Sequence, residues 1–303
     1  MKELIVISGK GGTGQTSIMG AFATLAENKI LCDADVDAAD LHLLVNPSIQ
    51  QQYDFKSGHT AVIHQEDCTA CGRCRELCRW DAINEDFVID PIACEGCGVC
   101  VYFCPETAIG FPENTCGEWY ISKTRFGSMV HARLGIAEEN SGKLVTLVRN
   151  EARKLAEQEG VPLILTDGPP GVGCPVIAAI GGADGVLAVT EPSVSGIHDL
   201  KRVCQLAQHF NVPAMICINK FDLNLALTED IETYARTNHI ECLGRIPFDP
   251  AFTHAMVQAK TIFEYDASSA SAHAVRQIWK QIAKRMDVVS LPGGDVKSLA
   301  PTM

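Results

Sequence analysis

The distribution of cysteine constrains this chain more than any other feature of its sequence. Eight of the fourteen cysteines fall between Cys68 and Cys104, and the other six are scattered through the rest of the 303 residues. A disulfide framework would extend over a small secreted domain, whereas a local group of thiols in a long chain is typical of metal binding. The cysteines therefore predict a small metal-binding unit, at residues 65–111, inserted in a larger domain.

The spacing of these cysteines indicates which metal group they hold. They form two runs with the pattern CxxCxxCxxxC, the spacing of two-cluster bacterial ferredoxins, in which the fourth cysteine of each run binds the other cluster. Zinc is the alternative, because CxxC pairs also form tetrahedral zinc sites, but zinc does not explain a doubled triplet with a detached fourth member. Two [4Fe-4S] clusters are predicted, one with ligands Cys68, Cys71, Cys74 and Cys104, the other with Cys94, Cys97, Cys100 and Cys78.

The rest of the chain has the pattern of an α/β fold. Short apolar runs alternate with helical stretches, as in a parallel sheet that is covered by helices on both faces. Strands are predicted at 4–8, 30–33, 163–167, 185–190, 214–219 and 242–246, helices at 16–27, 143–159, 197–210 and 271–285, and a returning hairpin at 118–134.

The predicted fold class is therefore α/β, a P-loop, doubly wound and mostly parallel sheet with an inserted small α+β domain that is like a bacterial ferredoxin. The sheet domain is expected to be discontinuous, at 1–64 and 112–286, on either side of the insert at 65–111. Residues 287–303 have no amphipathic periodicity and are expected to form a flexible tail.

A glycine-rich segment follows the first predicted strand and opens the first predicted helix. Glycines allow successive backbone N–H groups to turn inward around an anion at a helix N-terminus, which is how phosphate-binding loops work. Thr16 occupies the position whose hydroxyl holds Mg²⁺, and Gln15 stands where the P-loop signature has lysine. The predicted loop consists of Gly9, Lys10, Gly11, Gly12, Thr13, Gly14, Gln15, Thr16 and Ser17.

Polar residues at the ends of other strands support a nucleotide site. Asp33 and Asp167 each end a predicted strand, at the sheet edge where phosphates and Mg²⁺ bind in such folds. Either aspartate alone is better explained as a helix cap or turn residue, but together with the glycine loop they predict a Mg²⁺ site. Asn219, Lys220 and Asp222 form an NKxD motif, which can read a purine base and by itself allows GTP as well as ATP.

Several segments together resemble one family. KGGTGQTS, DADVD, DGPPG, PSVSGIHDL and IPFDPAF are similar to the MinD/Mrp group of deviant Walker A P-loop ATPases, relatives of the nitrogenase iron protein. With its cysteine insert, the chain resembles members with an inserted ferredoxin domain, over about residues 1–286. The resemblance implies ATP and Mg²⁺ between the subunits of a dimer, with Lys10 reaching the partner's phosphates. It also implies that Asp35 positions the attacking water and that Asp33 and Asp167 lie near Mg²⁺.

The combination predicts a nucleotide-switched ATPase that couples ATP to electron transfer, or to metallocluster handling, for a protein partner. We expect a homodimer, or a heterodimer with a related ATPase. Because Gln15 lacks the lysine charge that stabilises phosphoryl transfer, hydrolysis is expected to be slow or absent. The alternatives are a non-hydrolysing scaffold or redox sensor, and a carrier of Fe–S clusters.

Charge and hydropathy exclude other classes of function. The formal net charge of −12 argues against nucleic-acid binding, which requires lysine and arginine at the phosphates. The sequence has neither a signal-peptide core nor an apolar run of bilayer length, and therefore predicts a cytoplasmic protein that is not inserted in a membrane.

Overall fold

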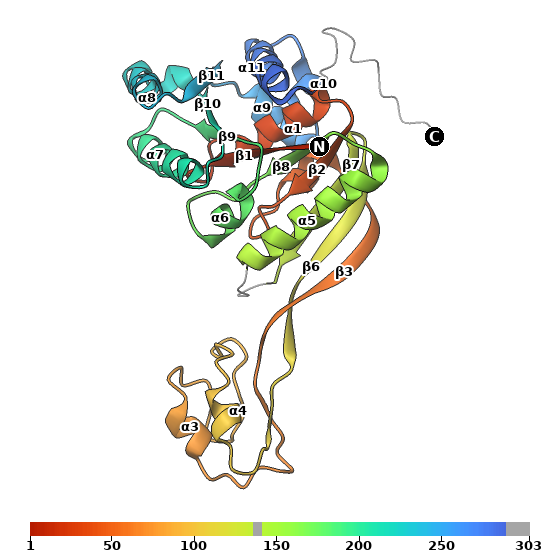
Figure 1. Ribbon diagram of the computed structural model, residues 1–303, viewed down its shortest axis with the longest axis vertical. Helices are drawn as coiled ribbons and strands as arrows, with labels where there is room; N and C mark the ends of the chain where they lie inside the picture. The colour runs from red at the N-terminus through yellow and green to blue at the C-terminus, as the bar shows by residue number, and fades with distance from the viewer. Residues whose placement is uncertain (136–140, 289–303) are drawn as a thin grey trace. The chain divides into compact units, whose positions relative to one another are not determined.

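A nine-stranded, mostly parallel sheet forms the centre of the larger part of the molecule in the computed structural model, which describes residues 1–135 and 141–288 (Figure 1). The strands of this sheet follow the order β11-β10-β9-β1-β8-β2-β7-β6-β3. They are β1 (Lys2–Ser8), β2 (Lys29–Asp33), β3 (Ser48–His59), β6 (Glu113–Thr124), β7 (Gly127–Leu134), β8 (Leu163–Asp167), β9 (Gly185–Thr190), β10 (Ala214–Asn219) and β11 (Glu241–Ile246).

The parallel part of this sheet confirms the α/β prediction. Strands β11, β10, β9, β1, β8, β2 and β7 pair in parallel, each with its neighbour. The predicted strands 163–167, 185–190 and 214–219 coincide with β8, β9 and β10, because continuous apolar runs are the pattern of strands buried on both faces. The predicted hairpin corresponds to β6 and β7, which are joined by Arg125 and Phe126.

Helices cover both faces of the sheet (Figure 1). Leu4 and Val6 of β1 belong to the core formed with α1 and α11, where the rings of Phe22 and Trp279 lie 5.2 Å apart. Strand side chains alternate between faces, so the equally buried Ile5 and Ile7 point to the other side. The helices of this unit are α1 (Gln15–Leu25), α2 (Leu41–Val45), α5 (Ser141–Glu159), α6 (Cys174–Ile180), α7 (Val194–His209), the 3₁₀ turn η1 (Phe221–Leu223), α8 (Leu225–Thr237), α9 (Ala251–Val257), α10 (Ile262–Asp266) and α11 (Ala270–Met286).

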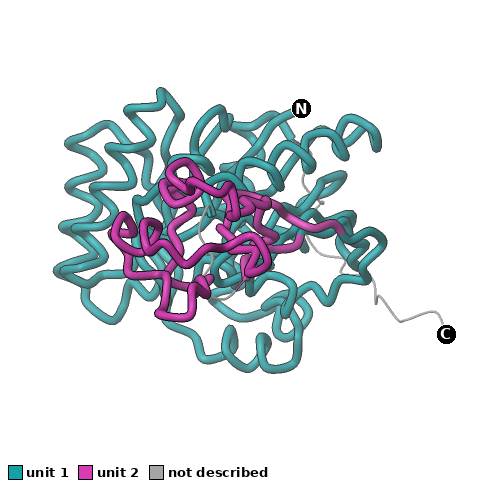
Figure 2. Tube along the Cα trace, turned by 90° about the horizontal axis from the view of Figure 1, so that it is seen from below, with its two compact units in different colours: residues 1–52, 119–133, 141–303 teal, residues 53–118, 134–140 magenta. Residues whose placement is uncertain are grey.

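The chain divides into two compact units (Figure 2). One consists of Met1–Gln52, Trp119–Arg133 and the chain from Ser141, and the other contains Tyr53–Glu118 and resumes at Leu134. The predicted insert, 65–111, lies within the second unit. That unit has the two-stranded sheet β4 (Val62–Ile63) and β5 (Ile109–Gly110), with the short helices α3 (Arg73–Leu77) and α4 (Val99–Phe103).

Strands β3 and β6 carry the chain from one unit to the other, since the boundaries at residues 52 and 118 fall inside them. The sequence analysis did not predict β3 and began the β6 hairpin too late. Within the described ranges, no helix has both the length and the apolar character needed to cross a bilayer. The predicted tail lies outside the described residues, except for Asp287 and Val288.

Candidate functional site

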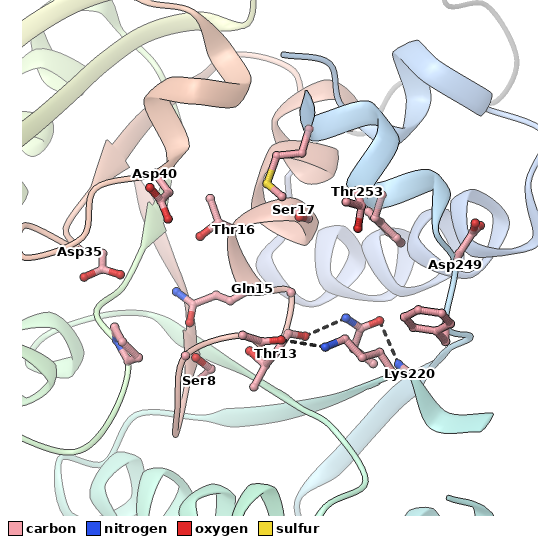
Figure 3. A pocket seen from close by; sticks show the side chains of 18 of the residues that line it. Ser8, Thr13, Gln15, Thr16, Ser17, Asp35, Asp40, Lys220, Asp249 and Thr253 are labelled. Carbon is pink, nitrogen blue, oxygen red and sulfur yellow. Dashed lines mark hydrogen bonds between the residues drawn. The ribbon is translucent and has the colours of Figure 1, made fainter. Parts of the chain in front are cut away.

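The glycine loop between β1 and α1 forms one wall of a cavity of about 380 Å³ (Figure 3). Gly12 and Gly14 have φ angles of +81° and +85°, which side chains disfavour. A Cβ atom on Gly14 would also lie 2.4 Å from Asn219 Nδ2, so this position requires glycine. The cavity is lined by Ser8, Gly11, Gly12, Thr13, Gly14, Gln15, Thr16, Ser17, Asp35, Ala38, Asp40, Pro170, Asn219, Lys220, Pro247, Phe248, Asp249, Phe252, Thr253 and Met256.

Gln15 is buried and directs its amide to the neighbouring strands. Its Nε2 donates to Asp167 Oδ1 at 2.7 Å, to Gly168 O at 2.5 Å and to Val6 O at 3.2 Å. The side chain therefore links the loop to the carboxyl ends of β1 and β8. The amide carries no charge, so it hydrogen-bonds to Asp167 without neutralising it.

Three aspartates gather at the carboxyl ends of β2 and β8. Asp33 and Asp167 are register partners on adjacent strands, and both are fully buried. Burial and the charges of Asp167 and Asp35 raise the pKa of Asp33 well above its ordinary value. Burial raises the pKa of Asp167 to about 6, although hydrogen bonds from Gln15 and Thr16 oppose the shift, and raises that of Asp35 to about 7.

These carboxyl groups fit a hard divalent cation. Among the described residues, Asp33 Oδ2 is buried with no hydrogen-bond partner, as is Thr13 Oγ1 in the loop. Lys220 is the only lysine or arginine among the described residues that line the cavity. Mg²⁺ binds through one or two carboxylates together with phosphate oxygens. Thr16, Asp35 and Asp40 line the cavity, whereas Asp33 and Asp167 lie outside its lining.

Lys10 does not line the cavity; its side chain is held by residues that follow β9. Its Nζ contacts Glu191 Oε1 at 2.7 Å and donates to the hydroxyls of Ser193 and Ser195, both at 3.1 Å. Gly9 also lies outside the lining, and a Cβ there would be 2.4 Å from Asp199 Cβ. The sequence analysis missed Glu191, since only the fold brings residues 10 and 191 together.

Glu191 also holds a second lysine. Lys220 Nζ donates to Glu191 Oε2 at 3.0 Å and to Gly12 O at 2.8 Å. Burial opposes ionisation of Glu191, but the hydrogen bonds from Lys10 and Lys220 keep the pKa of its carboxyl below the ordinary value. Glu191 thus fixes both lysines against the glycine loop.

The NKxD residues lie where β10 ends, but they do not act as one group. Asn219 Nδ2 donates to Thr13 O at 2.7 Å, and both Asn219 and Lys220 line the cavity. Asp222 is not in the lining; its Oδ1 accepts from the backbone N–H of Phe248 at 2.7 Å. The aromatic and sulfur side chains at this end, Phe248, Phe252 and Met256, were not predicted.

The cysteine runs surround two further cavities, both in the second unit. Cys68, Cys71, Cys74 and Cys104 line one, and Cys78, Cys94, Cys97 and Cys100 line the other. These are the two crossed sets that the spacing predicts. Among the described residues, no group of three or more His, Cys, Asp or Glu side chains has the geometry to bind a metal ion.

The sheet, the glycine loop and the acidic edge define a P-loop type of nucleotide-binding domain. The sequence comparison agrees: residues 4–262 match the CobQ/CobB/MinD/ParA nucleotide binding domain, and the chain belongs to this family. The uncharacterized protein MJ0578 of Methanocaldococcus jannaschii is 31% identical over 283 residues, 92% of this chain and 96% of that protein.

Two other similarities are to a solved structure and to a ferredoxin. The septum site-determining protein MinD of Pyrococcus horikoshii, solved with Mg-ADP, aligns with a TM-score of 0.57 and 16% identity, over 94% of this chain and 96% of that one. This similarity shows the fold. A ferredoxin 7Fe of Hydrogenibacillus schlegelii is 38% identical over 72 residues, 22% of this chain and 92% of the ferredoxin.

We predict that Asp33→Asn stabilises the Mg²⁺-free protein at about pH 8. When folding raises the pKa of a carboxyl group, its contribution to stability is complete below the unfolded pKa, near 3.8. That contribution is lost as the pH rises through the folded pKa, which is about 6 for Asp167 and about 7 for Asp35. The unfolding temperature of the wild type should therefore fall from about pH 5 to pH 8 without Mg²⁺, and Asp33→Asn should reduce that fall. Thermal unfolding at each pH checks this, with Asp230→Asn as an exposed control; equal slopes in all three proteins contradict it.

We predict that Gln15→Lys raises ATP hydrolysis by at least about tenfold, because a lysine adds positive charge where charge moves to the leaving oxygen. Gln15→Met, of similar length but without charge, is the matched control. Phosphate release in saturating Mg-ATP measures the rate. If the wild type already hydrolyses ATP rapidly and Lys and Met have the same effect, another cation has taken over this role.

Proposed function

We propose that this protein binds ATP with Mg²⁺, holds two [4Fe-4S] clusters, and uses its nucleotide state to control electron transfer, or metallocluster handling, with a partner protein. One observation carries the proposal: a single chain combines a phosphate-loop cavity with two cavities that are each lined by four cysteines. Family membership alone supports only nucleotide binding.

The loop and the acidic edge support Mg-ATP as the nucleotide. Backbone N–H groups of residues 11–16 at the start of α1 can bind the phosphates. Thr16 lines the cavity and bonds to Asp167, so these two residues together with Asp33 would hold Mg²⁺. Adenine is favoured over guanine because Asp222, the base-reading residue of the NKxD motif, already accepts from Phe248 N–H. The Mg-ADP in the similar MinD structure points the same way.

The two cysteine cavities support iron–sulfur clusters. Such clusters supply one-electron transfer, and thiolates with nearby N–H donors hold them. The backbone N–H of Ala108 lies 3.4 Å from Cys104 Sγ and donates to it. Eight thiols complete two sets of four, whereas the ferredoxin relative is a 7Fe protein, so the iron count separates the two possibilities.

The path of the chain supports coupling between the two parts. Asp35 and Asp40 line the nucleotide cavity, and the chain continues through α2 directly into β3, which enters the cysteine-rich unit. Only a short stretch of chain therefore separates Asp35 from that unit. A change in the contact of Asp35 with a bound phosphate or Mg²⁺ could be passed along this stretch. Nucleotide switches commonly act by ordering such segments.

The assembly follows from the same proposal. With Lys220 the only cation lining the cavity among the described residues, phosphate charge is poorly balanced within one chain, and a second subunit can supply Lys10 across a homodimer or a related heterodimer. Release of Lys10 from Glu191 would be required.

A non-hydrolysing scaffold or sensor is the second candidate, favoured by the neutral Gln15. We retain a cytoplasmic location as a prediction.

We predict eight iron and eight sulfide atoms per chain after anaerobic reconstitution, two cubanes using all eight clustered thiols. Cys78→Ser should alter the spectrum of the cluster held by the second cysteine run, and Cys174→Ser, an exposed cysteine outside both cavities, should alter neither. Metal analysis and electron paramagnetic resonance provide the readout. Stoichiometric zinc without charge-transfer absorbance would contradict the cluster proposal. Seven iron atoms would mean that only one of the two clusters is a complete cubane.

We also predict that Mg-ATP shifts the reduction potential of at least one cluster. Coupling between linked sites is typically about 1–3 kcal/mol, which corresponds to about 40–130 mV for a one-electron couple. Redox titration with and without Mg-ATP measures the shift, and Asp33→Asn, which should weaken Mg²⁺ binding, should reduce it. Potentials that agree within error would favour an uncoupled scaffold.

A further inference from the structure

The turn between β6 and β7 carries an arginine that the proposed chemistry does not use. Arg125 and Phe126 form this turn, and Thr124 closes it, since its Oγ1 donates to Gly127 O at 2.8 Å and accepts from Phe126 N–H at 3.0 Å. Phe126 packs against the main core, and the Arg125 guanidinium lies over its ring, 4.5 Å from the centroid. The turn therefore gives the guanidinium a defined position.

Arg125 connects segments that are distant in the sequence. Its Nε and Nη2 donate to the Glu264 carboxylate of α10, at 2.6 and 2.8 Å. Nη2 also donates to Leu44 O in α2 at 2.7 Å and to Ala259 O, beyond the end of α9, at 3.0 Å. All four residues belong to the first compact unit. One side chain thus links the hairpin turn to α2, α9 and α10.

The two backbone acceptors are carbonyls at the ends of helices. Leu44 lies in the last turn of α2, where C=O groups have no partner within the helix. Ala259 follows the C-cap residue of α9 and has a φ of +52°, a left-handed conformation that residues other than glycine rarely adopt. Arginine near a helix C-terminus can bond such carbonyls. The guanidinium therefore caps both helices and supports a strained residue after α9.

Both of these helices border the nucleotide cavity. Phe252, Thr253 and Met256 of α9 line it, and so does Asp40, the residue before α2. Figure 3 shows Asp40 beside Asp35 on one side of the cavity and Thr253 on the other. A single guanidinium therefore holds the far ends of two helices whose near ends lie on different sides of one cavity.

Glu264 extends the same set of contacts to α1. Its Oε2 accepts from Thr261 N–H at 2.8 Å, and Thr261 Oγ1 lies 2.9 Å from Thr24 Oγ1 on α1, the helix that the glycine loop opens. Burial opposes ionisation of Glu264, but hydrogen bonds from Arg125 and Thr261 keep the pKa of its carboxyl below the ordinary value. The carboxylate thus stays charged and fixes Arg125 in a forked pair, the geometry in which arginine binds carboxylate most strongly.

We propose that Arg125 is a positioning residue for nucleotide binding, which holds α2 and α9 from the β6–β7 turn so that Asp40 and the α9 wall keep their places around a bound Mg-nucleotide. This role rests on the proposed function. Because linkage is reciprocal, a residue that strengthens nucleotide binding is itself held more firmly in the bound protein. Strand β6 comes from the cysteine-rich unit, so a bound nucleotide should order the turn where this strand ends.

The test compares Arg125→Lys with Arg245→Lys in the full-length protein. Arg245 forms the same kind of forked pair, with Glu232 at 2.6 Å and near the ring of Phe221, but among the described residues it donates to no backbone carbonyl. Lysine keeps the charge at both positions and loses the fork. In calorimetric titrations with Mg-ADP, Arg125→Lys should weaken binding by about tenfold, and Arg245→Lys should stay within about twofold of the wild type.

Glu264→Gln tests the same contacts from the other side. Glutamine keeps an oxygen for Thr261 N–H, and so the cap of α10, but it loses the charge that fixes Arg125. It should weaken Mg-ADP binding by about threefold or more. Added to Arg125→Lys it should have little further effect, because the two residues act through one pair. Should Arg125→Lys fail to fold, Glu264→Gln alone decides the outcome.

Hydrogen exchange provides a readout that a general loss of stability does not reproduce. Mg-ADP should slow amide exchange of residues 119–128 by at least about twofold in the wild type and in Arg245→Lys, but not in Arg125→Lys. A purely structural role would lower the unfolding temperature of Arg125→Lys and leave its Mg-ADP affinity and its nucleotide-dependent exchange equal to those of Arg245→Lys. That result would overturn the inference.

The titration of the wild type separates this inference from the proposed function. If the wild type does not bind Mg-ADP, the proposal of a nucleotide site fails, and the inference fails with it. If the wild type binds Mg-ADP and neither Arg125→Lys nor Glu264→Gln weakens binding, the inference alone is overturned and the nucleotide site stands.

Discussion

Negative charge buried at the carboxyl ends of β2 and β8 governs the nucleotide-type site. Asp33 and Asp167 face each other in register on adjacent parallel strands, and Asp35 follows within two residues. Charges that are buried together must be protonated, hydrogen-bonded or neutralised by a cation. Gln15 of the glycine loop meets part of this requirement, because its amide donates a hydrogen bond to Asp167. The rest is left to protons or to a metal ion, so metal, pH and loop conformation are linked at this edge.

The two lysines near the loop are both paired with one carboxylate. A lysine at position 15 would bring charge to Asp167, but this chain has a neutral amide there. Its two nearby lysines, Lys10 and Lys220, both bind Glu191, which follows β9, and of the two only Lys220 lines the cavity. The positive charge that phosphates need is thus present but held by a carboxylate. A bound nucleotide, its metal ion or a second subunit must compete for it.

The predictable features were those whose signal is local in the sequence. Strands β8, β9 and β10 could be bounded to the residue because each is a continuous apolar run that is buried on both faces. The cysteines that line each of the two cavities are those that the spacing groups together, and their role as cluster ligands stays a prediction. Strand β3 could not be predicted, because residues 48–54 are mostly polar and exposed, without the alternation that marks a half-buried strand. Helix α7 begins at Val194, three residues before the predicted start, since Ser193 caps it.

Contacts between segments that are distant in the sequence could not be predicted from it. The Glu191 carboxylate meets Lys10 across 181 positions of sequence, and no motif joins them. Which residues of β4 bond to β5 is a matter of register and not of composition. Asp222 was expected at a base but serves as an acceptor for the Phe248 backbone. Spacing identifies residues that share a loop, and only the fold decides which loops meet.

The crossing strands have a consequence for how this molecule could have arisen. Strands β3 and β6 are neighbours in the sheet, and the chain leaves the first unit on one and returns on the other. Two adjacent strands can be joined by a turn of a few residues, so the cysteine-rich segment occupies the place of a hairpin loop. Gain or loss of the segment would leave the order of the remaining strands unchanged. In evolutionary terms, the cysteine-rich part is a loop extension whose addition or removal is compatible with the rest of the sheet.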